Sequence, residues 1–220
     1  MFKKALKYLP ILCLALWAVS GVAKADTLTY TLTVDGCTGG CGAGPYGTIT
    51  LMDDGSGNVN VTEQLATNYY FVNTGAGNPL EFNLSTAGTI ANVASSTYFA
   101  AGTGSSYHGS TFGYFTNAIV CTSSCGSGGS NSFNVPQSLT FTVDGVSASD
   151  FIANSDGNFF AADVGEAGYS KDVWTIIATG NVGALGSPTT PPVIPEPPTL
   201  LLLGTGLAAL AGMIKLKSLA

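Results

Sequence analysis

Apolar and polar residues alternate where the middle of the chain begins. In the segment 28–34, Leu28, Tyr30, Leu32 and Val34 fall on one face, and three threonines fall on the other. A period of two is typical of a β-strand with one buried face. The sequence therefore predicts a half-buried strand at the start of the middle part of the chain.

The same alternation continues in short segments separated by turn residues. Segments 48–51 and 59–62 flank Asp-Asp-Gly-Ser-Gly-Asn, and together they predict a hairpin. Segment 149–154 predicts a single helical turn, and no amphipathic helix of twelve residues is evident. Further strands are expected at 69–72, 80–84, 111–120, 139–143, 159–164 and 173–179.

About nine short strands between Gly, Asn and Ser turns favour an all-β fold. For residues 26–186 we expect a β-sandwich of jelly-roll type. The apolar positions of the strands are its core candidates: Leu28, Tyr30, Leu32, Ile49, Leu51, Val61, Phe82, Leu84, Phe112, Phe141, Val143, Phe160, Trp174 and Ile176.

The N-terminus has the three parts of a secretory signal. Three lysines precede a short apolar stretch, and Ala23-Lys24-Ala25 places small residues before Asp26. We expect residues 1–25 to be a signal peptide that is cleaved before Asp26. The alternative is an N-terminal membrane anchor, for which the apolar stretch is short.

A second apolar segment lies near the C-terminus. We expect residues 199–214 to form a single transmembrane helix, which would span roughly 24 Å, slightly short of a bilayer core. A buried core helix is the alternative, but the segment has no polar face. Lys215 and Lys217 follow, so the tail 215–220 is expected in the cytoplasm and the body outside. The linker 187–198 is half proline, which favours an extended chain.

Pro195-Glu196-Pro197, the apolar span and the final lysines occur in that order, behind a distant signal peptide. This arrangement resembles the PEP-CTERM sorting signal, with lysines in place of the usual arginines. The resemblance implies a bacterial exported protein whose tripeptide is recognised by a membrane-embedded exosortase. Exosortase and signal peptidase would be its processing enzymes, and exopolysaccharide its surroundings.

The same kind of tail also carries the name of an ice-binding protein C-terminal domain, which is no sign of ice binding in itself. The body resembles a domain that recurs before such tails. The resemblance rests on the Cys-Thr-Gly-Gly-Cys-Gly turn from Cys37 and on segments 71–75 and 159–163. It implies no known activity.

Four cysteines remain after the signal peptide, as two closely spaced pairs. An exported protein with an even number of cysteines is expected to form disulfides. We favour Cys37–Cys41 and Cys121–Cys125 among the three possible pairings. A zinc site built from four thiolates is the rival interpretation, because its cysteines have similar spacing.

Charged residues make up only 9% of the chain, and the formal net charge is −6. Between Asp26 and Asp172 twelve acidic residues face one base, Lys171. This balance opposes nucleic-acid binding, which needs clustered cations. No cofactor is expected, although oxygen ligands for Ca²⁺ could gather at two turns, at Asp53, Asp54 and Asn58 and at Asp156, Asn158 and Asp163.

Candidate catalytic chemistry is sparse. His108 is the only histidine and lies in a Gly- and Ser-rich segment without a nucleophile motif. Glu63 and Glu81 could pair as sugar-cleaving carboxylates, but surface placement explains them equally well. We therefore expect no catalytic residues and no enzyme activity.

Three functions fit this sequence. The leading one is a non-catalytic surface or matrix protein associated with exopolysaccharide, which it would contact through hydroxyls, amides and aromatic rings. The second is an adhesin or a carbohydrate- or ice-binding module, for which Thr29, Thr31 and Thr33 form one row of hydroxyls. The third is a β-sandwich hydrolase that would depend on His108.

Overall fold

A computed structural model describes residues 27–127, 130–170 and 173–190. The chain forms two units, Met1–Thr190 and Pro191–Ala220, and the fold described below belongs to the first. The predicted signal peptide, the Pro195-Glu196-Pro197 motif and the apolar segment 199–214 lie outside the described residues. Within the described ranges, no helix is long and apolar enough to cross a membrane.

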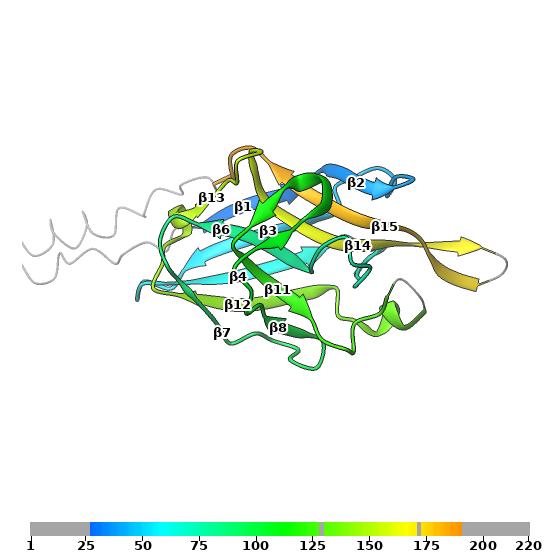
Figure 1. Cartoon of the computed structure of the whole chain (residues 1–220), viewed down its shortest axis with the longest axis horizontal. Coiled ribbons are helices and arrows are strands. Elements are labelled where there is room, and N and C mark those ends of the chain that lie inside the picture. The colour runs from blue at the N-terminus through cyan, green and yellow to red at the C-terminus, as the bar shows by residue number, and fades with distance from the viewer. Residues whose placement is uncertain (1–26, 128–129, 171–172, 191–220) are drawn as a thin grey trace, which may run out of the picture. The chain divides into compact units, whose positions relative to one another are not determined.

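Two antiparallel sheets carry the fold, so the all-β prediction is confirmed (Figure 1). The first sheet has five strands, in the order β1 (Thr27–Leu32), β3 (Gly47–Asp53), β4 (Asn58–Leu65), β12 (Ser138–Asp144) and β7 (Thr89–Ala91). The predicted hairpin is β3–β4, in which Leu51 lies opposite Val61.

The second sheet is larger and contains the two longest strands. Its order is β2 (Val34–Thr38), β15 (Val173–Leu185), β14 (Asn158–Ser170), β6 (Leu80–Leu84), β11 (Asn117–Cys121) and β8 (Phe99–Ala101). Two short strands pair beside this path, β5 (Tyr69–Phe71) with β14 and β13 (Phe151–Ile152) with β6.

The remaining elements are short. They are the strand pair β9 (Tyr107–His108) and β10 (Tyr114–Phe115), and the 3-10 helices η1 (Ser110–Phe112), η2 (Ser130–Asn134) and η3 (Ala148–Asp150). The strand predicted at 111–120 is thus three elements, η1, β10 and β11, because Gly113 adopts a positive φ of 85° and turns the chain. The helical turn predicted at 149–154 is shorter, since η3 ends at Asp150 and the next two residues form β13.

The sheets share one core of apolar side chains. Phe82 of the second sheet stacks on Phe141 of the first, with ring centres 5.9 Å apart. Tyr30 and Phe160 make a second contact between the sheets, at 4.9 Å. Most predicted core residues are buried, as the alternating pattern requires.

The second sheet is covered on its outer face as well. Along β14, Phe160, Ala162 and Val164 face the shared core, whereas Ala161 packs against Phe112 and Phe115 in a separate cluster. Phe112 is therefore buried as predicted, but in the cluster on the outer face.

Candidate functional site

The hairpin of β14 and β15 extends beyond its neighbours in the sheet (Figure 1). β5 pairs with β14 only at 164–166, and β2 pairs with β15 only at 179–183. Between these limits, residues 167–170 and 173–176 pair only with each other. No further strand among the described residues therefore supports the outer part of the hairpin.

Two large aromatic side chains stand exposed on this part. Tyr169 lies opposite Trp174 in the strand register, and their rings meet edge to face at 5.9 Å. Tyr169 is 64% exposed and Trp174 is 58% exposed. The prediction that Trp174 lies in the core is wrong, because β15 continues past the last strand that the described residues pair with this hairpin. Ile176 is half-buried.

A cavity of about 330 Å³ opens beside these aromatics. It is lined by Asn68, Tyr70, Phe133, Ala167 and Trp174, which we call the aromatic pocket. Tyr70 lies opposite Gly165 on the outer face of β14, and its ring meets that of Phe133 edge to face at 5.0 Å. Two separate chain segments, at 68–70 and at Phe133, and the hairpin thus form one pocket.

The aromatic pocket has the chemistry of a site for an uncharged ligand. None of its five lining residues carries a carboxyl, amino, guanidinium or imidazole group. Its volume falls at the lower end of the range for small-molecule sites. The negative faces of the aromatic rings attract the positive C–H edges of a ligand, and the Asn68 amide supplies donors and an acceptor.

A second regular surface covers the outer face of the first sheet. Thr29, Thr50, Thr62 and Thr140 lie opposite one another in four successive strands, and we call them the threonine ladder. Every position in the rows on either side of the ladder is uncharged. These rows are Thr31, Thr48, Gln64 and Ser138, and Thr27, Met52, Asn60 and Thr142.

The threonine ladder sets a repeat. Neighbouring strands lie about 4.8 Å apart, and alternate residues along a strand lie about 7 Å apart. Of the predicted row of Thr29, Thr31 and Thr33, only Thr29 belongs to the ladder. Thr31 lies in the neighbouring row, and Thr33 lies beyond the end of β1 at Leu32. The other three members come from strands for which the sequence alone shows no common row.

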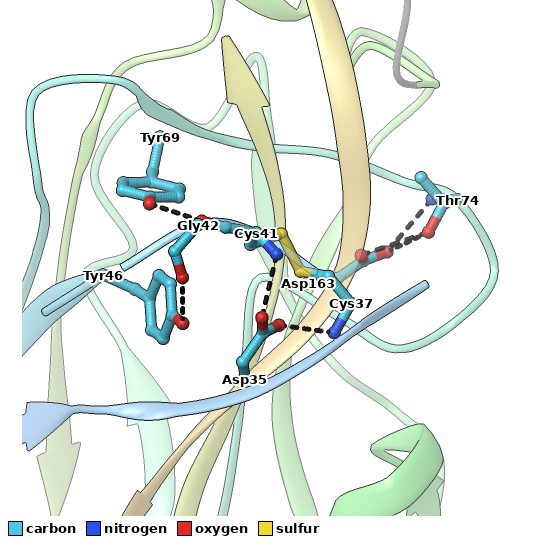
Figure 2. The surroundings of a disulfide bond; sticks show 8 residues. All are labelled: Asp35, Cys37, Cys41, Gly42, Tyr46, Tyr69, Thr74 and Asp163. Carbon is cyan, nitrogen blue, oxygen red and sulfur yellow. Dashed lines mark hydrogen bonds between the residues drawn. A yellow bond between two sulfur atoms is a disulfide. The ribbon is translucent and has the colours of Figure 1, made fainter. Parts of the chain in front are cut away.

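Both disulfides are present in the favoured pairing, and Figure 2 shows the surroundings of the first. The Asp35 carboxylate accepts hydrogen bonds from the backbone N–H groups of Cys37 and Cys41, at 2.8 and 2.9 Å. The Tyr69 hydroxyl donates to the Cys41 carbonyl at 2.6 Å.

Asp35, Cys37 and Cys41 hold their ligand-type atoms within 4.8 Å of one another. Each sulfur is already joined to its partner, however, and the Asp35 oxygens accept the hydrogen bonds of the loop. The four sulfurs are therefore not available to zinc as thiolates.

The first predicted calcium turn is satisfied by its own hydrogen bonds. Asp54 accepts from the backbone of Ser56 and from both the backbone and side chain of Asn58. These bonds lower the pKa of Asp54, the one from the Asn58 side chain most. Asp53 accepts from the backbone of Ala148 at 2.8 Å. The Asp54 carboxylate thus acts as a turn former, whereas that of Asp53 holds the start of η3.

The second predicted calcium group is not a single cluster. The Asn154 side chain accepts from the backbones of Asp156 and Asn158, which closes a turn. Asp163 lies further along β14 and accepts from Thr74 instead.

The candidate catalytic residues lie apart. His108 is exposed on β9, and its ring lies against Tyr114 at 4.6 Å. Glu63 belongs to β4 and faces the core, whereas Glu81 belongs to β6 and faces outward, so they do not form a pair. Surface placement of either glutamate is wrong, because both are fully buried.

One sequence signal points to the aromatic pocket in retrospect. Tyr169 and Trp174 flank the polar residues Ser-Lys-Asp, which are typical of a hairpin end.

Comparison of the chain with protein-family models, with curated proteins and with solved structures gave no match.

Proposed function

We propose that this is an exported, non-catalytic surface or matrix protein that binds uncharged polysaccharide in the aromatic pocket. Its route would follow the PEP-CTERM resemblance, with signal cleavage before Asp26 and exosortase processing near Pro195-Glu196-Pro197. The jelly-roll order, the signal peptide, the membrane helix 199–214 and the cytoplasmic tail stay predictions within this proposal.

The observation that carries the binding proposal is the exposure of Trp174 and Tyr169 beside the cavity. Exposed apolar side chains that gather beside a hollow, unlike single exposed ones, are typical of a binding site. A sugar ring offers C–H groups on its faces and hydroxyls at its rim. Aromatic faces and an amide suit both features, and no cation is needed.

Retention on polysaccharide tests this proposal. The full chain, Trp174→Ala and Tyr169→Ala are run through gels containing exopolysaccharide from the producing cells or defined neutral glucans. We expect wild-type migration to be retarded and both variants to lose about tenfold in affinity, equivalent to about 1.4 kcal/mol. Tyr114→Ala is the matched control, since Tyr114 is 65% exposed but lies on β10. Equal migration of all four proteins, with and without glycan, would refute the binding.

The processing proposal has its own test. Mass spectrometry of the mature protein should find its N-terminus at Asp26 and its C-terminus near Pro195-Glu196-Pro197. Replacing Glu196 by Ala should leave the C-terminal segment attached. A mature chain of 220 residues would contradict the proposal.

The threonine ladder favours a second candidate, binding to an ordered lattice such as ice. Its methyl and hydroxyl groups repeat from strand to strand on an uncharged face. Water ordered on such a face would share the repeat. Slowed growth of ice crystals in the presence of the full chain supports this function, and unchanged growth removes it.

A further inference from the structure

Three polar side chains lie buried on the outer face of the second sheet. Glu81, Asp163 and Asn181 come from the adjacent strands β6, β14 and β15, and none is exposed to solvent. Asp163 lies directly opposite Asn181. Glu81 lies opposite Ala161, two residues from Asp163 on the same face of β14.

The loop between β5 and β6 closes over this group. Its two ends are fastened to Asp163, whose backbone carbonyl accepts from Val72 at 3.3 Å and whose N–H donates to Asn78 at 2.8 Å. Thr74 donates its N–H and hydroxyl to the Asp163 carboxylate, at 3.1 and 2.8 Å. The loop therefore passes directly over the three side chains.

Two glycines lie against the buried polar side chains. A Cβ atom on Gly77 would overlap the Asn181 amide, and one on Gly109 would come within 2.7 Å of Glu81 Oε2. The chain thus approaches both polar groups as closely as backbone permits.

Hydrogen bonding leaves part of the group without partners. Asn78 donates to Glu81 Oε1 at 2.6 Å, but Glu81 Oε2 has no partner among the described residues. Within the same part of the chain, neither Oδ1 nor Nδ2 of Asn181 has one. Buried polar atoms are rarely left in this state, because each has lost its hydrogen bonds to water and gained none in the fold.

Charge compensation is also missing. The described residues contain neither lysine nor arginine, and His108 is exposed on β9. Burial raises the pKa of Glu81 to about 7 and that of Asp163 to about 6. Within the described ranges, two neighbouring carboxyl groups are therefore enclosed with no lysine or arginine to balance them.

We propose that Glu81, Asp163 and Asn181 bind one Ca²⁺ ion beneath the β5–β6 loop. Glu81 Oε2, the Asp163 carboxylate and Asn181 Oδ1 would be the side-chain ligands. Carboxylate and amide oxygens are the ligands that Ca²⁺ prefers, and backbone carbonyls commonly complete its shell of six to eight. Of the residues in the predicted calcium turns, only Asp163 belongs to this site. The proposal stands independently of glycan binding.

Calcium titration of the full chain, stripped of metal with EGTA, tests the site. By calorimetry we expect one Ca²⁺ per chain, with the affinity of extracellular modules, about 10⁻⁴–10⁻³ M. The thermal unfolding temperature should rise with Ca²⁺ concentration, since the ion binds only the folded state. Mg²⁺ should bind more weakly, because it demands stricter geometry.

Two variants decide the assignment. Glu81→Gln keeps the shape of the side chain and should lose at least tenfold in Ca²⁺ affinity. Asn181→Asp adds a carboxylate and should bind more tightly than wild type, which an unfolded variant would not do. Glu63→Gln is the matched control, because Glu63 is equally buried but faces the core from the other sheet; its affinity should equal that of wild type.

The proposal fails if calcium leaves the unfolding temperature unchanged up to about 10 mM, a tenfold excess over the weakest expected affinity. It also fails if Glu81→Gln binds as well as wild type, since the ions would then lie on the acidic surface. Preference for Mg²⁺ over Ca²⁺ would overturn the choice of ion.

Discussion

Glu63 lies directly opposite Leu139 in the register of β4 and β12, so a carboxyl group faces an aliphatic side chain inside the core. On its other side it lies opposite Ile49. Neither carboxyl oxygen of Glu63 has a hydrogen-bond partner among the described residues. Burial therefore raises the pKa of Glu63 well above its usual value.

Glu63→Met should stabilise the protein. The substitution replaces an unpartnered polar group by an apolar chain of similar size, which should raise the free energy of unfolding by about 1–3 kcal/mol. Urea denaturation measures the change, with Gln64→Met on the exposed side of β4 as the control. A loss of stability in Glu63→Met alone would show that the carboxyl has a partner or a role in the core.

Stability should fall as the pH rises through the neutral range. The folded protein holds protons on Glu81 and Asp163 at pH values where the unfolded chain has released them, because their pKa values in the fold are about 7 and about 6. Their contribution is complete below about pH 4 and is lost as the pH passes 6 and 7. Desolvation is the main cause for both, and for Glu81 the nearby Asp163 adds to it.

Urea denaturation in EGTA between about pH 4.5 and 8 measures this effect. Glu81→Gln should remove about 3 kcal/mol of the decline, the equivalent of a shift from 4.5 to about 7. A stability that increases with pH over this interval in wild type would contradict the assignment.

Trp174 and Phe82 should respond differently to truncation. Trp174→Ala should change the free energy of unfolding by less than about 0.5 kcal/mol, because the side chain is exposed. Phe82→Ala should cost about 3–5 kcal/mol, because Phe82 is fully buried between the sheets. A large loss of unfolding free energy in Trp174→Ala would show that this side chain packs in the core.

The two disulfides form rings of equal size but differ in burial. Cys37→Ser with Cys41→Ser should cost about 2 kcal/mol from loop entropy, and the same holds for Cys121→Ser with Cys125→Ser. The first pair should cost more in total, because Cys41 is fully buried and its serine would bury a hydroxyl. Thermal unfolding of both double variants measures which disulfide contributes more stability. A greater loss of stability in the variant without Cys121–Cys125 would contradict this prediction.

A lysine in the threonine ladder tests the lattice-binding candidate. Thr62 is exposed near the middle of the ladder, so Thr62→Lys should fold normally and interrupt the repeat. Any effect of the wild-type chain on ice growth should then disappear. Thr38→Lys should keep the effect, because Thr38 is exposed on β2, outside the ladder. Retained activity in Thr62→Lys would place the active face elsewhere.

Local alternation was sufficient to find most of the strands. β6 and β12 and the hairpin β3–β4 follow from a period of two, because neighbouring side chains of a strand point to opposite faces whatever surrounds them. The pairing of the close cysteines follows from similarly local chemistry, and the composition alone argued against nucleic acid.

Burial and cross-strand neighbours required the tertiary structure. Glu63 occupies an inward position of the β4 pattern, yet its carboxyl argued for the surface; the register places it in the core all the same. Glu81 is buried because the β5–β6 loop folds over it. Trp174 is exposed because no strand in the described part of the chain reaches the end of its hairpin. Periodicity assigns a side chain to a face of its own strand, but which segments cover that face, and which residues stand opposite across strands far apart in sequence, depends on how the whole chain packs.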